Sequence, residues 1–292
     1  MRAGLLALII LIVLLALGIS AYFFFHSPSG DPLKKQEGNE LRKVDFIAEN
    51  LAERLSRIEA NRDFKTDYSF TLFDNGTVSF HVHAMHAGQF CPLHLHEDSE
   101  EVDFIIQGKG KVRSVLADPV KQSGRREIRE MLLENNSLFF APPGSAHEFI
   151  NMSDEALACL VIQTPPFKGN LYAKEENLEK SAEASIQILT ERADKMAGAG
   201  SGEAAVAVIK TLHNVESRLV RTAAPLTETM ARGYDLIIIY FGGEALIEIL
   251  DKRIKLTPTY FLGIPAGTPF RIIPSQGSQD SYLLCFYLPP VS

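Results

Sequence analysis

The sequence has few cysteines and no concentrated positive charge, and both absences exclude classes of protein. The three cysteines are odd in number and none forms a CxxC pair, so a disulfide framework and a zinc ribbon are excluded. Cys159 and Cys285 lie in apolar runs and are expected to be small buried residues, whereas Cys91 is expected to pack or to lie in a loop near His94. No Lys/Arg cluster is present and the formal net charge is −7, so nucleic acid is not expected as a partner.

The N-terminal segment differs in composition from the rest of the chain. No charged residue occurs from Ala3 to Phe25, where Leu, Ile, Val and Phe dominate. Because about 20 apolar residues in a helix span the hydrocarbon core of a bilayer, this segment is expected to be a transmembrane helix. A cleaved signal peptide is the alternative, although its apolar region usually has about 7–15 residues. We expect residues 1–38 to be a single-pass membrane anchor and tether, with the globular part outside the cytoplasm.

The remaining sequence divides into two strand-rich regions. A length of 292 residues suits two domains of roughly 100–150 residues each. Helical periodicity predicts an amphipathic helix from Asn39 to Arg62 and a second helix from Lys174 to Ala197. The flexible run Gly198–Gly202 is the expected boundary. The predicted divisions are a helix and first domain at 39–170, a helical linker at 171–202 and a second domain at 203–292.

Period-two patterns in both regions predict an all-β fold. From Tyr68 onward, short strand-like runs are separated by turn signals such as Asp74-Asn75-Gly76. About eight short strands at this spacing favour a sandwich or barrel over an α/β fold. The two regions also resemble each other, and this internal repeat predicts a duplicated barrel. The matching segments are Glu101–Val112 with Asp235–Leu246, and Ser137–His147 with Tyr260–Phe270.

Four residues of the first region form a candidate metal site. His94 and His96 are two residues apart in an extended segment, so their side chains point to the same face. Glu101 opens the next apolar strand, and His147 follows a Pro-Gly turn much later in the chain. Three imidazoles and one carboxylate suit one divalent ion of Fe, Mn, Ni, Cu or Zn and leave positions open for substrate, water or oxygen.

Two blocks of this sequence resemble the motifs of the cupin superfamily. The first block, GQFCPLHLHEDSEEVDFIIQG, supplies Gly88, His94, His96, Glu101 and Gly108 at the spacing of the first cupin motif. The second block, NSLFFAPPGSAHEFIN, supplies Pro142, Gly144, His147 and Asn151, with Asn136 in place of the leading glycine. The motifs cover residues 88–151, and the strand pattern is consistent over 65–167. The resemblance implies cupin-type jelly-roll barrels. Together with the predicted helices, it leads to an expected fold of two such barrels joined by a helical linker and preceded by the transmembrane helix.

The second region is expected to keep the barrel and lose the metal site. Alignment of Gly242 with Gly108 places Glu228 at the position of His94 and Met230 at that of His96. It places Asp235 at the position of Glu101 and Phe270 at that of His147. One carboxylate pair and a thioether are poor ligands for these metals. The second barrel is therefore interpreted as a structural barrel or an apolar pocket.

A row of histidines precedes the first motif and has two interpretations. His81, His83 and Met85 alternate with apolar residues, so one face of this strand carries histidine. If that face turns into the barrel, the histidines orient substrate or support the metal ligands. If it turns outward, they are surface residues.

The predicted function is that of a membrane-anchored, metal-binding protein with a small-molecule ligand. By resemblance, one reading is a dioxygenase-like oxidoreductase that acts on a small oxygenated or aromatic acid, and cupin isomerases and decarboxylases are alternatives. The other reading is a non-catalytic ligand-binding or sensing module, and fold alone does not choose between the two. The sequence leaves a homo-oligomer open and identifies no catalytic residue beyond the four metal ligands.

Overall fold

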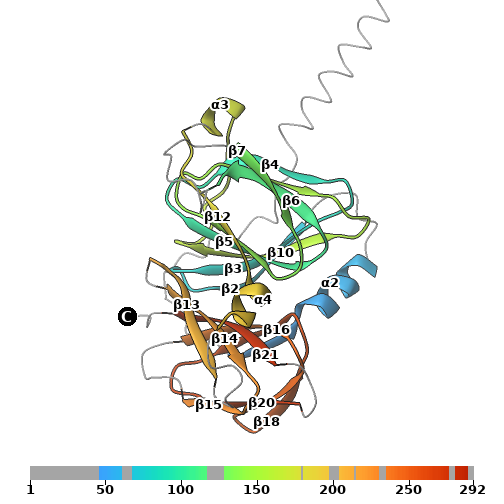
Figure 1. Cartoon of the computed structure of the whole chain (residues 1–292), viewed down its shortest axis with the longest axis vertical. Helices are drawn as coiled ribbons and strands as arrows, with labels where there is room; N and C mark the ends of the chain where they lie inside the picture. Colours follow the sequence, from blue (N-terminus) through green and yellow to red (C-terminus); the bar gives the residue numbers. More distant parts are fainter. Residues whose placement is uncertain are drawn as a thin grey trace, which may run out of the picture. The chain divides into compact units, whose positions relative to one another are not determined.

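The computed structural model describes most of the chain from Phe46 onward. The described residues are 46–60, 68–116, 128–178, 180–196, 204–213, 215–229, 235–275 and 280–288. Residues 41–292 form one compact unit. Its described part consists of many strands and a few short helices, as expected for an all-β fold (Figure 1).

The first barrel is built from two sheets. Its inner sheet has the order β12 (Ser185–Ile188), β8 (Ser137–Ala141), β5 (Glu100–Gln107), β10 (Leu157–Thr164), β3 (Ser79–Met85) and β2 (Tyr68–Asp74). Its outer sheet has the order β11 (Leu171–Tyr172), β4 (Phe90–Leu95), β9 (His147–Asn151), β6 (Gly110–Val115) and β7 (Ile128–Leu133).

The second barrel repeats this arrangement. Its inner sheet has the order β1 (Ile47–Asn50), β19 (Tyr260–Ile264), β16 (Asp235–Gly242), β21 (Ser281–Leu288), β14 (Val215–Thr222) and β13 (Ala205–Leu212). Its outer sheet has the order β15 (Leu226–Thr229), β20 (Pro269–Pro274), β17 (Ala245–Ile249) and β18 (Lys252–Leu256).

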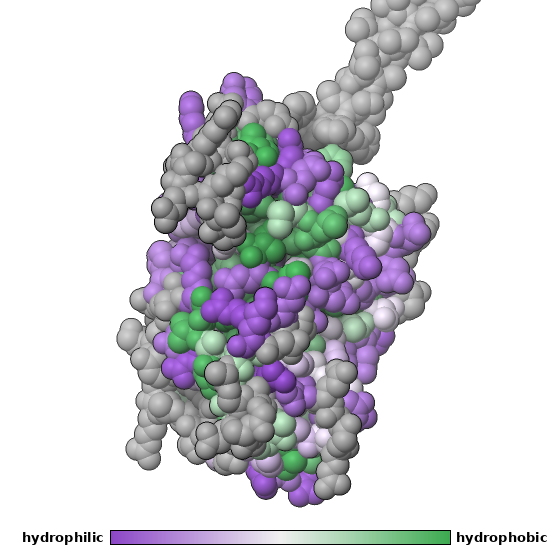
Figure 2. All heavy atoms as spheres, viewed as in Figure 1, coloured by the Kyte–Doolittle hydropathy of each residue, from purple (hydrophilic) through white to green (hydrophobic). Residues whose placement is uncertain are grey.

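The two inner sheets pack against each other and share one hydrophobic core. In β5, Val102 and Phe104 belong to this shared core together with Ile237 and Leu284 of the second barrel, while Ile105 belongs to the interior of the first barrel. The central strands β5, β10, β16 and β21 are thus buried on both faces, which explains their nearly continuous apolar sequences. Figure 2 shows apolar side chains gathered over the first barrel and bordered by polar ones.

Each barrel takes one strand from a segment that precedes the other barrel. Strand β1 lies before the first barrel, yet Ile47 pairs with Gly263 of β19 in the second. Strand β12 lies between the barrels, yet Ser185 pairs with Phe140 of β8 in the first. A helix follows each exchanged strand, namely α2 (Leu51–Ala60) after β1 and α4 (Leu189–Asp194) after β12.

These exchanged strands correct the prediction of two long helices. Part of the helix predicted at 39–62 is strand β1, and its earlier residues lie outside the described part. The segment predicted as one helix at 174–197 contains α3 (Glu175–Leu178), β12 and α4. Both predictions relied on local periodicity. The two four-residue segments are strands instead of helices because each pairs with the edge of a distant sheet.

The predicted transmembrane helix and membrane localisation are also corrected. In the described part of the chain, no helix is long and apolar enough to cross a membrane. Helix α2 has 10 residues and carries Glu53 and Arg54, whereas about 20 apolar residues are required. The segment Ala3–Phe25, on which the prediction rested, lies outside the described residues. The expected extracytoplasmic position of the globular part depended on that anchor and is withdrawn with it.

A buried tyrosine in the second barrel should lower the free energy of unfolding at alkaline pH. The Tyr240 hydroxyl hydrogen-bonds with Ser281 Oγ at 2.8 Å, and burial raises the pKa of Tyr240 to about 12. In the unfolded chain this phenol ionises near pH 10. The stabilisation that the buried, neutral phenol gives the folded state is therefore complete below pH 10 and is lost as the pH rises towards 12. We expect Tyr240→Phe to remove about 2 kcal/mol of the alkaline loss in unfolding free energy. Denaturant titrations of both proteins at pH 8 to 12 test this, and equal pH slopes would contradict it.

Candidate metal centre

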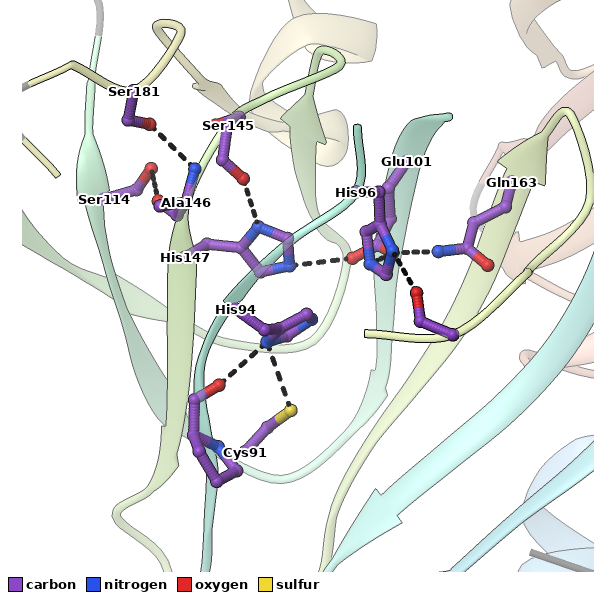
Figure 3. A network of polar contacts seen from close by, with 12 residues as sticks. Cys91, His94, His96, Glu101, Ser114, Ser145, Ala146, His147, Gln163 and Ser181 are labelled. Atoms are coloured by element: carbon purple, nitrogen blue, oxygen red, sulfur yellow. Dashed lines mark hydrogen bonds and ion pairs between the residues drawn. The ribbon is translucent and has the colours of Figure 1, made fainter. Parts of the chain in front are cut away.

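The four predicted ligands meet inside the first barrel. His94 lies on β4, His96 follows that strand, Glu101 lies on β5, and His147 begins β9. All four are buried, and each offers a ligand atom within 4.8 Å of those of the others. In Figure 3 the imidazoles of His94 and His147 lie beside the Glu101 carboxylate. The sequence-based selection of these residues therefore corresponds to one spatial cluster.

Local backbone features bring these residues together. His94 pairs directly with His147 across β4 and β9, after a register shift between Cys91 and His94. Gly144 has a φ of 75°, which glycine adopts readily, and its N–H donates to the His96 carbonyl at 2.7 Å. The Pro-Gly turn before His147 thus also fixes the backbone that carries His96.

Every histidine of the cluster is oriented by a backbone carbonyl. Nδ1 of His94 lies 2.8 Å from the Pro92 carbonyl oxygen, and Nδ1 of His147 lies 3.0 Å from that of Ser145. Nδ1 of His96 lies 3.3 Å from the carbonyl oxygen of Gly169. Each contact favours the proton on Nδ1 and leaves the Nε2 lone pair available, as in histidines that bind metals.

The inward-facing Nε2 atoms fit a bound cation. His96 Nε2 lies 2.8 Å from Glu101 Oε2, and His147 Nε2 lies 3.0 Å from Glu101 Oε1. These are ion-pair distances, but neither Nε2 has a hydrogen-bond partner of acceptable geometry. Buried lone pairs facing a carboxylate repel each other unless a cation or proton lies between them. The donor set therefore fits a divalent transition metal.

The protonation preferences of His94 and Glu101 suit metal ligands, whereas that of His96 favours its protonated form while no cation is bound. Burial, together with nearby His147, lowers the pKa of His94 to about 3. Burial opposes ionisation of Glu101, but His147 and His96 outweigh it and hold the pKa of this carboxyl well below its ordinary value. For His96, burial is outweighed by contact with Glu101, so its pKa is raised. A neutral imidazole and an ionised carboxylate are the forms that bind metals.

Two residues beside Glu101 were not identified from the sequence. Gln163 on β10 pairs in register with Glu101, and its Nε2 donates to Glu101 Oε2. Asp103 is two residues further along β5 on the same face, and burial and then the charge of Glu101 raise its pKa well above its ordinary value. Alternation along β5 was a usable signal for Asp103, whereas the uninterrupted apolar run of β10 concealed the orientation of Gln163.

The histidine face of β3 turns into the first barrel. Met85 belongs to the barrel interior, whereas Val82 and Ala84 belong to the core between the sheets, so His81 and His83 point inward with Met85. Burial lowers the pKa of His81 to about 4, and Glu101 and His96 are among the groups that act on it. The interpretation of His81 and His83 as surface residues is therefore wrong.

The cysteines lie where the sequence analysis expected them. All three are free and buried. Cys91 Sγ lies 3.7 Å from His94 Nδ1, on the side of the ring that faces the Pro92 carbonyl. Because Nε2 is the atom of His94 that faces the cluster, Cys91 packs behind the His94 ring and is not one of the four clustered residues.

The second barrel has no equivalent cluster among its described residues. Glu228 pairs with Phe270 as His94 pairs with His147, which agrees with the predicted correspondence. Met230, predicted to replace His96, lies outside the described residues.

The predicted position of Asp235 is wrong by one residue. Leu236 pairs with Ile264 and Tyr287 as Glu101 pairs with Ala141 and Gln163. The shift arises because the glycine equivalent to Gly108 is Gly243, both having positive φ, of 84° and 77°. A buried leucine thus occupies the carboxylate position, and Asp235 accepts a hydrogen bond from the Ala266 N–H at 2.8 Å instead. This substitution makes the second barrel less suited to a metal than the sequence suggested.

The fold and the four-residue cluster define a cupin-type barrel protein. Residues 81–163 match the family model Cupin_2, described as a cupin domain, so this part of the chain is a cupin domain. All four candidate ligands for the metal lie within it, three on β4 and β5 or directly between them, and His147 on β9. A search of curated proteins found no match.

Solved structures with the same fold cover most of the chain. A cupin 2 conserved barrel domain protein from Leptotrichia buccalis has a TM-score of 0.60 and 10% identity, covering 85% of this chain and 99% of its own. Salicylate 1,2-dioxygenase from Pseudaminobacter salicylatoxidans has a TM-score of 0.61 and 14% identity, covering 92% of each chain. The 7S globulin of Momordica charantia has a TM-score of 0.51 and 13% identity, covering 83% of this chain and 81% of its own. At these identities the likeness establishes the fold alone.

Proposed function

We propose that this chain is a metal-dependent, dioxygenase-like oxidoreductase that acts on a small oxygenated or aromatic acid. His94, His96, Glu101 and His147 hold one divalent metal, of the group Fe, Mn, Ni, Cu and Zn. The observation that best supports this proposal is that two buried Nε2 atoms, of His96 and His147, face the Glu101 carboxylate without hydrogen-bond partners. The similarity to salicylate 1,2-dioxygenase supports the choice of reaction class without establishing it.

The residues around the cluster have distinct roles in this proposal. Backbone carbonyls at Pro92, Ser145 and Gly169 hold the imidazoles in one orientation, and Gln163 orients the Glu101 carboxylate. A bound metal of this class supplies Lewis acidity and, for redox-active ions, electron transfer to oxygen. Apolar side chains of the first barrel's interior, including Ile105 and Phe149, exclude water from the side of the cluster that faces this interior.

We further propose that the chain is a bicupin produced by duplication. The two barrels share one strand order, and each contributes an exchanged strand followed by a helix. We propose domain limits of 39–170 and 203–292. The exchanged strands do not follow these limits, because β1 lies within 39–170 but pairs in the second barrel, and β12 lies in the linker but pairs in the first. Only the first barrel is assigned a metal.

Metal analysis followed by oxygen-uptake measurement tests the function. The purified full chain, reconstituted with Fe(II), is expected to retain about one metal per chain and to consume oxygen with salicylate or gentisate. The same chain carrying His94→Ala is the matched negative control and should do neither. Bound metal without oxygen uptake on any phenolic or keto acid would contradict the enzyme and favour a ligand-binding module. A native chain that retains no metal would contradict the proposal entirely.

A further inference from the structure

One of the three carbonyls that orient the clustered histidines comes from a distant part of the chain. For His94 and His147, the carbonyl belongs to the residue two positions earlier, so those contacts are local. For His96, the carbonyl belongs to Gly169, which lies 73 positions away in the sequence. Its distance from Nδ1, 3.3 Å, is also the longest of the three. The orientation of His96 therefore depends on where the segment around Gly169 lies.

The segment that carries this carbonyl, residues 165–173, is termed the strap. Both of its ends are attached to the first barrel. The Thr164 hydroxyl, directly before the strap, donates to the Thr77 carbonyl at 3.2 Å, and the Ala173 N–H donates to the Leu93 carbonyl at 2.9 Å. Near its second end, the strap pairs with β4 through the two residues of β11. All nine strap residues are half-buried or exposed, and a segment of this kind opens at a lower free-energy cost than a buried sheet.

An aromatic ring of the strap lies against the ligand cluster. The Phe167 ring centroid lies 5.8 Å from that of His96 and 5.7 Å from that of His81. The Phe167 N–H donates to Ser79 Oγ at 3.4 Å. Because Phe167 is 42% exposed, its ring lies between solvent and these two imidazoles. Movement of the strap would therefore withdraw the ring and the Gly169 carbonyl from His96 together.

We propose that the strap is a lid coupled to metal binding, with Gly169 as the positioning residue that couples them. In the closed strap, the Gly169 carbonyl accepts the Nδ1 proton of His96, so Nε2 keeps its lone pair for the metal. In the open strap, His96 loses this acceptor and Phe167 uncovers the site for a small molecule. Because coupling between binding equilibria is reciprocal, the metal favours the closed strap by the factor by which closure strengthens metal binding. The inference rests on the metal site of the proposed function and requires no turnover.

Trypsin cleavage of the full chain with and without Zn(II) tests this coupling. Lys168 is exposed and precedes Gly169, so the bond between them lies in the strap and is cut when the strap opens. We expect saturating Zn(II) to slow this cut about tenfold. The matched control is the bond between Lys109 and Gly110, in the turn between β5 and β6, because Lys109 is also exposed and also precedes glycine. Mass spectrometry of the products gives both rates, and the control rate should stay the same.

The comparison of the two bonds separates closure of the strap from general stabilisation by the metal. Equal slowing at both bonds would show that Zn(II) stabilises the whole fold, and this would overturn the coupling. An unchanged rate at Lys168 in a chain that binds Zn(II) would overturn it as well. A native chain that binds no Zn(II) would instead contradict the proposed function.

The substitution Gly169→Ala tests the role of the glycine. Gly169 has a φ of 118°, which residues with a Cβ adopt only with strain, yet a Cβ there would have no atom within 4 Å. The substitution therefore disfavours the closed backbone without a steric clash. We expect about fivefold weaker Zn(II) binding by calorimetry and faster cutting after Lys168 in the presence of Zn(II).

The control for this variant is Gly267→Ala in the second barrel. Gly267 has a φ of 75° and also has no atom within 4 Å of an added Cβ, so the substitution introduces a similar backbone strain far from the strap in sequence. We expect native Zn(II) affinity in this control. Native affinity in Gly169→Ala, or an equal loss in both variants, would overturn the assignment of Gly169 as a positioning residue.

Discussion

Replacing His147 with alanine is expected to lower the affinity for a divalent metal by at least about a hundredfold. Changes in groups that only support metal ligands typically cost about 10–100-fold, and loss of a donor atom should cost at least the upper value. His147 Nε2 is also the neighbour of Glu101 Oε1 at 3.0 Å, so the variant leaves one carboxylate oxygen without this partner. Competition against a chelator at fixed pH measures the affinity directly.

The control for this prediction is a histidine outside the barrel interior. The His213 side chain is 53% exposed and lies 3.5 Å from Glu100, so His213→Ala removes an imidazole without touching the cluster. We expect native metal affinity in this variant. Equal metal retention by His147→Ala and the native chain would show that the four residues are not a metal site. Circular dichroism of both variants establishes that the comparison is between folded proteins.

The substitution Phe80→Ala should destabilise the two barrels together by about 4 kcal/mol. Phe80 is fully buried on β3, and its ring centroid lies 5.9 Å from that of Phe261 and 5.5 Å from that of Phe286. Both partners belong to the second barrel, so truncation opens a cavity in the core between the inner sheets and removes two edge-to-face contacts. For a chain of this size the loss corresponds to a fall in melting temperature of roughly 10 °C.

Calorimetry distinguishes a shared core from two independent ones. We expect a single unfolding transition that moves as a whole in Phe80→Ala, with Phe90→Ala as the control because Phe90 is 55% exposed. Two separate transitions, of which only one shifts, would contradict a common core. The measurement should use metal-free protein, so that metal binding does not add to the difference.

The sequence was sufficient to select the four clustered residues because their placement depends on short, local features. The separation of His94 and His96 sets their common face, and the Pro-Gly turn with a positive φ at Gly144 sets the approach of His147. These features are encoded within a few residues of the ligands themselves. The all-β class followed for the same reason, because turn signals and period-two patterns are local.

The missed features depend on contacts between distant segments. Gln163 lies in a strand buried on both faces, so its sequence does not reveal which side points to Glu101. The misplaced Asp235 reflects the choice between the adjacent glycines Gly242 and Gly243, because only Gly243 has the positive φ of Gly108 and the sequence does not show which glycine has it. Strands β1 and β12 form only because an edge of the opposite barrel is available to them. For Gln163 and for the two exchanged strands, the deciding contact lies more than forty positions away, as between Glu101 and Gln163, which are separated by 62.

The reciprocal placement of β1 and β12 makes this chain the covalent counterpart of a domain-swapped dimer. In such a dimer each subunit donates an identical element to its partner, and here the linker holds donor and acceptor in one molecule. A single repeat, consisting of one exchanged strand, its helix and one barrel, would therefore have both a strand without an acceptor and an acceptor edge without a strand. Two such repeats satisfy each other. The first barrel's sheet therefore keeps its edge strand only while the segment that leads into the second barrel is present.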